Sequence, residues 1–352
     1  MKVAVLAPGN SIHTVKWVNA MAQRGHEVHL ATMHKALEAL HENIVEHPLL
    51  FPSPIGYYMN VFSLRKLLDK FVPDLLHAHY ASGYGTLARL CGYKPLLLSV
   101  WGSDVYDFPE ESRLKEKILE KNLAGADRIS STSHCMKMQT EKYVETKSPI
   151  EVIPFGVDTE VFYPQPNRDA EQITIGMVKK MAPHYGPKYL LEAFWAINKK
   201  YPNSRLILIG GGPQERELKR LARDYGIAES CNFVGPVPHG EVPRWLNKFD
   251  IYCAPSTLES FGVSVVEASA CGLPVIVSRV GGLPEVVQEG KTGLIIPPRD
   301  VHSLVQALET LISDQELRLK MGAAGRIYVQ QRYDWKFCVD KMEQLYYRMI
   351  DE

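Results

Sequence analysis

Two glutamates that flank a glycine are the residues of this chain best suited to bind a polar substrate. Glu259 and Glu267 are separated by seven residues, and Gly262 lies between them. Apolar and polar periodicity predicts a buried strand, a loop and a helix here, at residues 250–254, 255–260 and 261–271. Glu259 is therefore expected in the loop and Glu267 on the helix.

The start of this predicted helix is suited to bind an anion. The first N–H groups of a helix have no partner inside it, and the helix dipole adds partial positive charge there. Glycine lets a ligand approach the backbone closely, and each carboxylate can accept hydrogen bonds from hydroxyls. A phosphate with hydroxyls on both sides describes a nucleotide sugar, with Glu267 on the ribose and Glu259 on the hexose. The residues expected around the phosphate are Ser260, Phe261, Gly262 and Val263. The alternative is that both glutamates are solvated residues at the helix edge.

The surrounding segment resembles the retaining glycosyltransferases of family four. The signature of that family combines the two spaced glutamates with an Ala-Cys-Gly-Leu-Pro-Val-Ile run and a Gly-Gly-x-Pro-Glu turn. This chain has the run at residues 270–276 and the turn at residues 281–285. The resemblance covers nearly the whole chain and is strongest over residues 173–297. It implies the GT-B fold and a nucleoside diphosphate sugar as donor.

Short apolar strands that alternate with helical patterns predict two parallel sheets. The expected strands are residues 3–7, 27–32, 75–78, 96–100, 128–131 and 151–153, then 173–178, 206–209, 232–234, 251–254, 275–277 and 294–296. The Pro-rich polar stretch 158–172 predicts a linker. The expected fold class is α/β, with two doubly wound Rossmann-like domains that face a cleft. Residues 1–164 would form the acceptor-side domain and residues 165–333 the nucleotide-sugar domain. By resemblance, a last helix at 334–352 crosses back to the first domain.

The loop after the predicted strand 173–178 contains three lysines that could hold the donor diphosphate. Family members usually have an arginine here and then a lysine before a glycine. Lys180 falls at the arginine position, and no lysine precedes the glycine. A lysine is a point charge and lacks the bidentate fork of arginine. We expect Lys180 to be the main cation on the departing diphosphate, with Lys179 or Lys188 as the second. For Lys188, a solvated helix face is the alternative.

The loop after the first predicted strand offers a second phosphate contact. Gly9 and Asn10 could cradle a phosphate, and His13 opens the next helix. Neither a Gly-x-Gly-x-x-Gly fingerprint nor a Walker motif is present. The resemblance implies that this loop reaches the donor phosphates. For His13, a helix-start position without a chemical role is the alternative.

Two further strand ends carry the residues expected on the acceptor side. His77 and His79 share one face of a strand, but no third ligand lies at a recognisable spacing for a metal. Trp101 precedes Gly102, where many relatives have a histidine, and is expected to form an aromatic wall for a sugar ring. Asp104 is the carboxylate expected beside the acceptor, and a helix N-cap is its alternative role.

Composition excludes several classes of function. The 40 basic and 40 acidic side chains cancel, so the chain lacks the positive charge of a nucleic-acid binder. The six cysteines have no paired spacing, and no Asp-x-Asp motif occurs. We therefore expect no metal and no cofactor other than the nucleotide-sugar substrate. The base of the nucleotide is expected near Val234 and Gly235.

These residues predict transfer of a hexosyl group from a nucleoside diphosphate sugar to an acceptor hydroxyl, in cell-surface polysaccharide or glycoconjugate synthesis. The catalytic residues would be Lys180, Glu259 and Asp104. No second carboxylate offers itself as a nucleophile, so same-face attack with retention of configuration is expected. A nucleotide-sugar epimerase or a sugar phosphorylase on the same fold is one alternative. A non-catalytic two-lobed sugar-binding protein is another, but it would require export, and the N-terminal apolar run is too short for a signal peptide.

The predicted segment 55–72 raises the question of a membrane contact. It combines aromatic residues with Arg65, Lys66 and Lys70, as an interfacial helix does. A core-facing helix with one solvated side is the alternative. No run of 18 apolar residues occurs, so we expect a cytoplasmic protein with a possible peripheral contact at the inner face of the membrane. In the membrane case, the acceptor would be a polyprenyl-linked sugar.

Overall fold

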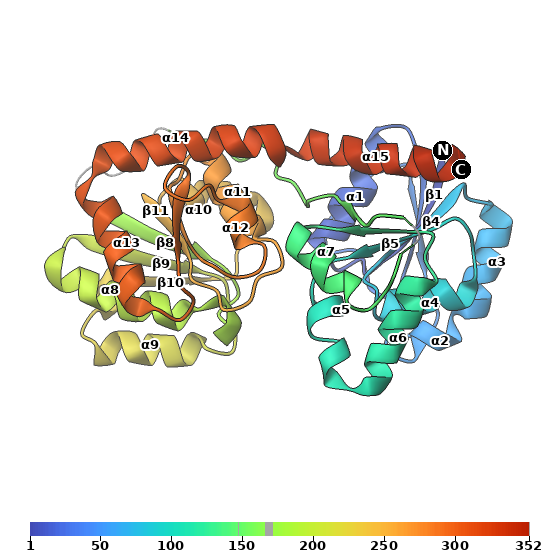
Figure 1. Cartoon of the computed structure of the whole chain (residues 1–352), viewed down its shortest axis with the longest axis horizontal. Helices are drawn as coiled ribbons and strands as arrows, with labels where there is room; N and C mark the ends of the chain where they lie inside the picture. Colours follow the sequence, from blue (N-terminus) through green and yellow to red (C-terminus); the bar gives the residue numbers. More distant parts are fainter. Residues whose placement is uncertain (147, 166–171, 352) are drawn as a thin grey trace. The chain divides into compact units, whose positions relative to one another are not determined.

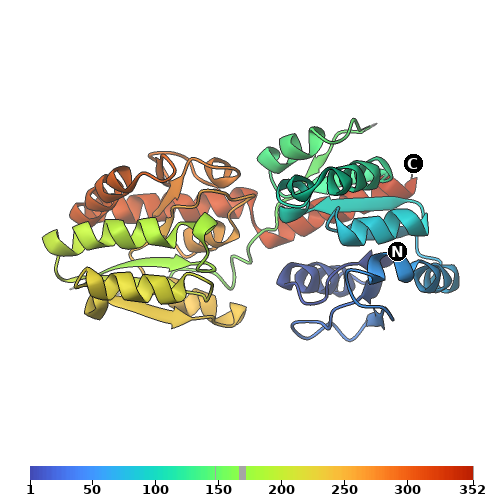
Figure 2. The ribbon, with the colours of Figure 1, turned by 90° about the horizontal axis from the view of Figure 1, so that it is seen from below.

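The computed structural model describes residues 1–146, 148–165 and 172–351. The chain forms two compact units, one of residues 1–155 with 337–352 and one of residues 156–336 (Figure 1). Part of the expected linker, residues 166–171, lies outside the described residues. Helices lie on both sides of the sheet in each unit (Figures 1 and 2).

The first unit is built on a seven-stranded parallel sheet. In spatial order its strands are β3 (Ile44–Pro48), β2 (Glu27–Thr32), β1 (Lys2–Leu6), β4 (Leu75–His79), β5 (Leu96–Val100), β6 (Arg128–Ser131) and β7 (Glu151–Val152). Its helices are α1 (Ile12–Gln23), α2 (Gly56–Met59), α3 (Val61–Phe71), α4 (Gly83–Cys91), α5 (Ser103–Tyr106), α6 (Arg113–Ala124) and α7 (His134–Glu141). The central strands β4 and β5 are buried along their whole length, as near-continuous apolar runs require.

Strand β3 is the one strand of this sheet that the sequence pattern did not predict. It pairs with β2 at the edge of the sheet, and most of its residues are exposed or half-buried. An edge strand needs no apolar run because one side of its backbone has no neighbour and its faces are partly solvated. Its last residue is Pro48, which is tolerated at an edge.

The helix at the C-terminus packs on the first unit, as the family resemblance implied. Helix α15 (Trp335–Asp351) places Glu343 2.6 Å from both Arg24 and His26, and Arg24 also pairs with Asp340. The buried hydroxyl of Tyr346 contacts His77 of β4. Figure 2 shows this red helix beside the sheet of the first unit.

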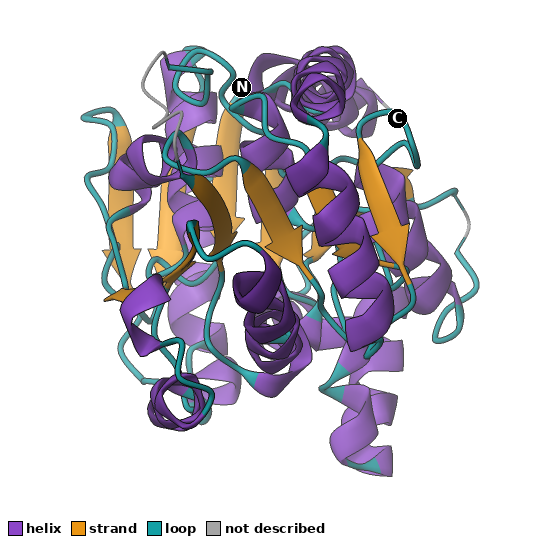
Figure 3. Cartoon of the chain, turned by 90° about the vertical axis from the view of Figure 1, so that its left-hand side faces the viewer, coloured by secondary structure: helices purple, strands orange, loops and turns teal. Residues whose placement is uncertain are grey.

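The second unit contains a six-stranded parallel sheet whose strands run in one direction (Figure 3). In spatial order its strands are β10 (Cys231–Gly235), β9 (Ser204–Ile209), β8 (Ile173–Val178), β11 (Ile251–Ala254), β12 (Val275–Ser278) and β13 (Gly293–Ile296). The helices are α8 (Pro187–Lys200), α9 (Glu215–Asp224), α10 (Val242–Leu246), α11 (Val263–Ala270), α12 (Leu283–Val286), α13 (Val301–Ser313) and α14 (Gln315–Arg332). Among the described residues, no helix is both long enough and apolar enough to cross a bilayer.

Candidate functional site

The loop between β11 and α11 carries Glu259, at the carboxyl ends of the strands where doubly wound sheets bind ligands. The helix begins two residues later than the sequence pattern suggested because Gly262, at φ +105°, forms its N-cap. Glycine adopts this conformation without the strain that a side chain would add. Phe261 is buried, so its ring is not available to a ligand.

A glycine pair supports this loop from behind. The N–H of Gly282 donates to the carbonyl oxygen of Glu259 at 3.0 Å. A Cβ atom on Gly281 would lie 1.8 Å from the same oxygen, and one on Gly282 would lie 2.5 Å from the carbonyl oxygen of Ser260. The Gly-Gly-x-Pro-Glu turn is therefore a packing requirement of the Glu259 loop, since any side chain there would displace it.

Lys179 forms an ion pair with Glu259. Its Nζ atom lies 2.6 Å from Oε2 of the carboxylate, and the two side chains are only 13% and 9% exposed. The ring of Tyr185 lies 4.7 Å from the same Nζ atom. Burial lowers the pKa of Lys179, but the charge and hydrogen bond of Glu259, together with Tyr252 and Tyr185, outweigh it and raise the pKa to about 12. Lys179 is therefore a fixed positive charge at this strand end.

The other two lysines of the loop lie at the surface. Lys180 is exposed, and its side chain has no hydrogen bond or ion pair with any residue that the structure describes. The Nζ atom of Lys188 lies 3.6 Å from Glu217, and both side chains are more than a third exposed. The structure thus places Lys179 against Glu259 and leaves Lys180, the lysine expected to be the main cation, facing solvent.

A glycine run on the neighbouring strand end fixes the lysine loop. Gly210 has φ +123°, and a Cβ atom there would lie 2.2 Å from the carbonyl oxygen of Lys179. The N–H of Met181 donates to Gly211 at 2.9 Å. The run of residues 210–212 does not match a dinucleotide fingerprint, and sequence reasoning assigned it no role. Because these glycines have no side chains, the loop after β9 packs with its backbone against the backbone of the loop after β8.

The second glutamate, Glu267, is buried on α11 and pairs with a histidine. Its Oε1 atom lies 2.8 Å from Nε2 of His239. His239 follows β10, and the last residue of that strand, Gly235, accepts a hydrogen bond from Gly210 at 2.8 Å. Val234 and Gly235 therefore lie at the strand end that leads to this histidine. Sequence reasoning missed His239, although a histidine in the loop expected near the base was a usable signal.

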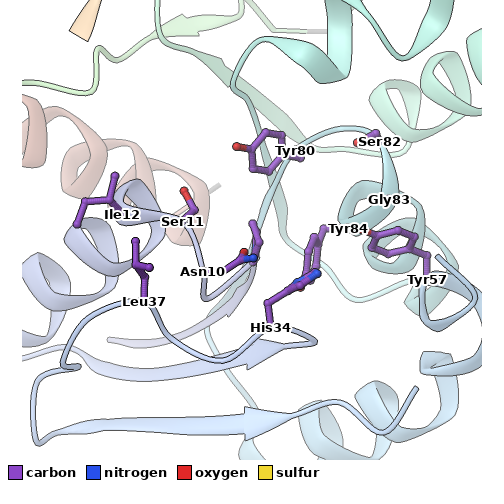
Figure 4. Close-up of a pocket in the computed structure, with 11 residues that line it drawn as sticks. Asn10, Ser11, Ile12, His34, Leu37, Tyr57, Tyr80, Ser82, Gly83 and Tyr84 are labelled. Atoms are coloured by element: carbon purple, nitrogen blue, oxygen red, sulfur yellow. The ribbon is translucent and has the colours of Figure 1, made fainter. Parts of the chain in front are cut away.

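The first unit contains a cavity of about 580 Å³ at the carboxyl ends of β1, β2 and β4. Figure 4 shows Tyr57, Tyr80 and Tyr84 around it, together with Asn10 and His34. The complete lining is Pro8, Asn10, Ser11, Ile12, His34, Leu37, Tyr57, Tyr80, Ser82, Gly83 and Tyr84. None of these is Lys, Arg, Asp or Glu, so the cavity wall is polar and aromatic.

The loop after β1 contributes Asn10 to this cavity, whereas Gly9 is used inside the loop. The N–H of Gly9 donates to the Thr32 hydroxyl at 2.9 Å. A Cβ atom on Gly9 would lie 2.3 Å from the carbonyl oxygen of His34. The N–H of Gly9 is therefore already hydrogen-bonded within the protein.

His13, in the first turn of α1, stacks on Phe155 at a ring distance of 3.9 Å.

Trp101 lies in an aromatic cluster at the end of β5. Its ring centroid is 4.3 Å from that of His79, 5.0 Å from that of Tyr80 and 5.2 Å from that of Phe155. The indole is buried at 8% exposure, so most of its surface already contacts protein. The indole that was expected to form a wall for a sugar ring is therefore largely covered by other side chains of the first unit.

Asp104 is buried and binds backbone N–H groups of two loops. Its carboxylate accepts hydrogen bonds from Ala81 at 2.8 Å, from Gly102 at 2.8 Å and from Trp101 at 3.1 Å. Burial raises the pKa of Asp104, and these N–H donors oppose the rise. The N-cap of α5 is Gly102, so Asp104 is not the N-cap itself. It joins the loops that follow β4 and β5.

The histidines of β4 are buried and belong to the sheet interior. His77 lies 2.6 Å from both the Tyr346 hydroxyl and the Ser99 hydroxyl, and burial lowers its pKa to about 3. His79 is also fully buried, which lowers its pKa well below the usual range. Over the described ranges, no cluster of three or more His, Cys, Asp or Glu residues could hold a metal ion.

Two family models match the chain. The model for glycosyl transferases group 1 matches residues 158–328, and the model for glycosyl transferase 4-like proteins matches residues 2–133. The curated relatives include the GDP-mannose-dependent alpha-(1-6)-phosphatidylinositol monomannoside mannosyltransferase of Mycobacterium tuberculosis. It is 30% identical over 329 residues, which cover 87% of this chain and 84% of the relative. The D-inositol 3-phosphate glycosyltransferase of Corynebacterium glutamicum is 31% identical over 79% of this chain and 73% of its own length.

Solved structures show the same fold. Sucrose-phosphate synthase from Thermosynechococcus elongatus superimposes with a TM-score of 0.86 at 22% identity, and the match covers 100% of this chain and 99% of that one. The HepE protein of Anabaena, solved in complex with UDP, superimposes with a TM-score of 0.82 at 18% identity over 98% and 99% of the two chains. Together with the matched family models and the curated relatives, these likenesses place the chain in glycosyltransferase family four, with the GT-B fold.

Proposed function

We propose that this glycosyltransferase moves a hexosyl group from a nucleoside diphosphate sugar to a sugar hydroxyl, with retention of configuration and without a metal ion. The observation that carries the proposal is the buried pair of Lys179 and Glu259 beside the N-terminus of α11. It combines a fixed cation, a carboxylate and open backbone N–H groups at one strand end. The mycobacterial relative is a GDP-mannose-dependent mannosyltransferase by name, which supports a donor of this class.

The donor would lie across the strand ends of the second unit. Glu267 would accept hydrogen bonds from the ribose hydroxyls through the carboxylate oxygen that His239 does not contact. The N–H groups that open α11 would bind the diphosphate, since the helix dipole favours negative charge there. Glu259 would accept hydrogen bonds from hexose hydroxyls while Lys179 balances its charge.

Departure of the diphosphate creates negative charge that the site has to stabilise. Lys179 keeps its proton because Glu259 raises its pKa, so it is a permanent cation for this charge. Preorganised groups of this kind contribute about 3–4 kcal/mol each to transition-state stabilisation. Lys180 lies next to it in the chain, and its exposed side chain would supply the second positive charge once the donor is bound.

Same-face attack would account for retention. Glu259 is paired with Lys179 and Glu267 with His239, so both carboxylates of the second unit's site already have partners. The bond between the anomeric carbon and the phosphate oxygen would break, and the acceptor oxygen would bond to the same face. The departing phosphate would take the proton of the acceptor hydroxyl.

The acceptor sugar would bind in the cavity of the first unit (Figure 4). Its tyrosine rings offer apolar faces to a sugar ring, and their hydroxyls with Asn10 offer hydrogen bonds. The uncharged lining suits a neutral sugar of a cell-surface polysaccharide or glycoconjugate. Asp104 would act indirectly, because it holds the two loops at the end of this sheet.

A donor screen tests the proposal. UDP-, GDP- and ADP-hexoses are incubated with simple glycosides as acceptors, and the release of nucleoside diphosphate is followed. We expect acceptor-dependent release with one base, and NMR coupling constants should show an axial anomeric bond in product and donor alike. Activity should persist in excess EDTA. Inversion of configuration, or a rate that only manganese or magnesium restores, would contradict the proposed mechanism.

A further inference from the structure

An exposed apolar stripe lies on residues 55–62, which comprise α2 and the start of α3. Four residues, Ile55, Tyr58, Met59 and Phe62, occupy positions i, i+3, i+4 and i+7 of this segment. Ile55 has helical backbone angles at the start of α2, and the turn residue Asn60 joins α2 directly to α3. All four side chains are exposed on this continuous segment. Phe62 is 80% exposed and Ile55 67% exposed. Leu50, at 79% exposure, and Phe51 precede the stripe in the loop.

The rest of this segment is anchored to the protein, so the stripe cannot turn inward. The opposite face of α3 buries Leu64, Leu68 and Phe71 in the core. The side-chain amide of Asn60 donates to the carbonyl of Phe51 at 2.8 Å and accepts from its N–H at 3.0 Å. The stripe is therefore held outward by contacts on the other side of the same helices.

Basic residues continue the same face of α3. Lys66 and Lys70 follow Phe62 by one and two turns, and both are exposed. Arg65 donates to the carbonyl oxygens of Leu90 and Cys91 at the end of α4. Asp69 is the acidic side chain of this helix. The stretch 61–71 thus carries three positive charges and one negative charge, although the whole chain has a formal net charge of zero.

We propose that this surface, the apolar stripe with Lys66 and Lys70, docks on an anionic lipid bilayer. Apolar and aromatic side chains beside lysines are the pattern of a helix that lies in the membrane interface. Each lysine near an anionic surface adds electrostatic attraction to it. A protein partner that covered the stripe would have to accommodate these lysines, whereas lipid headgroups pair with them directly.

The surface and the cavity of the first unit share one helix. Tyr57 of α2 lines the cavity, and its ring lies so close to Gly83 that a Cβ atom there would be 2.2 Å away (Figure 4). Its neighbour Tyr58 belongs to the stripe. Docking would therefore bring lipid to the wall of the cavity, and this would suit a lipid-linked acceptor. That last consequence depends on the proposed function, but the binding to lipid does not.

Sedimentation with vesicles tests the inference on the full chain. Vesicles of equal parts phosphatidylglycerol and phosphatidylcholine should bind the protein, and vesicles of phosphatidylcholine alone should bind it at least 10-fold more weakly. The double variant Ile55→Ser/Phe62→Ser and the variant Lys66→Glu/Lys70→Glu should each lose at least 10-fold in binding to the anionic vesicles. Leu114→Ser is the matched control, because Leu114 is 69% exposed on α6, outside the stripe.

The circular dichroism spectrum and the turnover number with a water-soluble acceptor should be unchanged in Ile55→Ser/Phe62→Ser. Lipid binding and catalysis are thereby measured separately. Equal vesicle binding by this variant and the native chain would overturn the inference. So would a native dimer, measured by light scattering, that fails to bind vesicles and becomes a monomer in the variant. In that case the stripe would be a contact between copies of the chain.

Discussion

The ammonium group of Lys179 lies 2.6 Å from the Glu259 carboxylate, although the two residues are 80 positions apart in the chain. Each comes from the end of a neighbouring strand, Lys179 directly after β8 and Glu259 from the loop after β11. The glycines of the 210–212 run and of the 281–282 turn leave room for both loops. Backbone packing therefore brings Lys179 and Glu259 together, and the attraction between their charges then holds the pair.

Lys179→Ala should lower the turnover number by about 100-fold or more, because one electrostatic contact to the leaving group is lost. It should also cost about 3–5 kcal/mol of stability, since Glu259 would be left buried without its partner. Lys180→Ala should have a smaller effect on turnover and none on stability, because its side chain is exposed. Steady-state kinetics and thermal unfolding of both variants check this.

The double variant Lys179→Met/Glu259→Gln separates the two effects. It removes both charges, so it should recover much of the lost stability without recovering turnover. If Lys180→Ala loses 100-fold in turnover while Lys179→Ala stays near the native rate, the diphosphate is bound by Lys180 and the pairing seen here is structural only.

Gly281→Ala should destabilise the second unit. The position has φ +49°, and the added Cβ atom would lie 1.8 Å from the carbonyl oxygen of Glu259. Backbone strain and overpacking together cost about 2–4 kcal/mol, which lowers the melting temperature by on the order of 5–15 °C. Gly240→Ala is the control, since a Cβ atom there would have no described atom within 4 Å other than those of its chain neighbours. Equal melting temperatures of the two variants would show that the Gly281 turn can move away.

Acid should destabilise the first unit through His77. This histidine is neutral when folded because burial lowers its pKa to about 3, but it takes up a proton near pH 6.5 when unfolded. The unfolded state therefore binds more protons than the folded state below pH 6.5. Through this group, the free energy of unfolding falls by about 1.4 kcal/mol for each unit by which the pH is lowered further.

Urea titrations between pH 5 and pH 6.5 measure this slope. His77→Gln keeps hydrogen-bonding groups toward Tyr346 and Ser99 but cannot titrate, so its mean slope over this range should be smaller by about 1 kcal/mol per pH unit. An identical slope in both proteins would mean that His77 takes up its proton while the chain is folded.

Much of the fold could be predicted from the sequence, because buried parallel strands consist of nearly continuous runs of apolar residues. Every strand expected from such a run is present, and β3 was missed because an edge strand needs none. The position of the two glutamates was also readable from the strand, loop and helix pattern. The sequence could not show which lysine faces the Glu259 carboxylate, because this depends on how the loop after β8 packs on Gly210. The pairing of His239 with Glu267 likewise depends on where two loops meet.

Calorimetric titration with nucleoside diphosphates tests most directly whether the second unit is a nucleotide-sugar site. At least one of UDP, GDP and ADP should bind the native chain, and Glu267→Ala should weaken that binding by about 1.5–3 kcal/mol, the range for hydrogen bonds to a charged group. His239→Gln should retain most of the affinity, because Glu267 is still present. Failure of all three nucleotides to bind, or unchanged affinity in a folded Glu267→Ala variant, would contradict the assignment of the site.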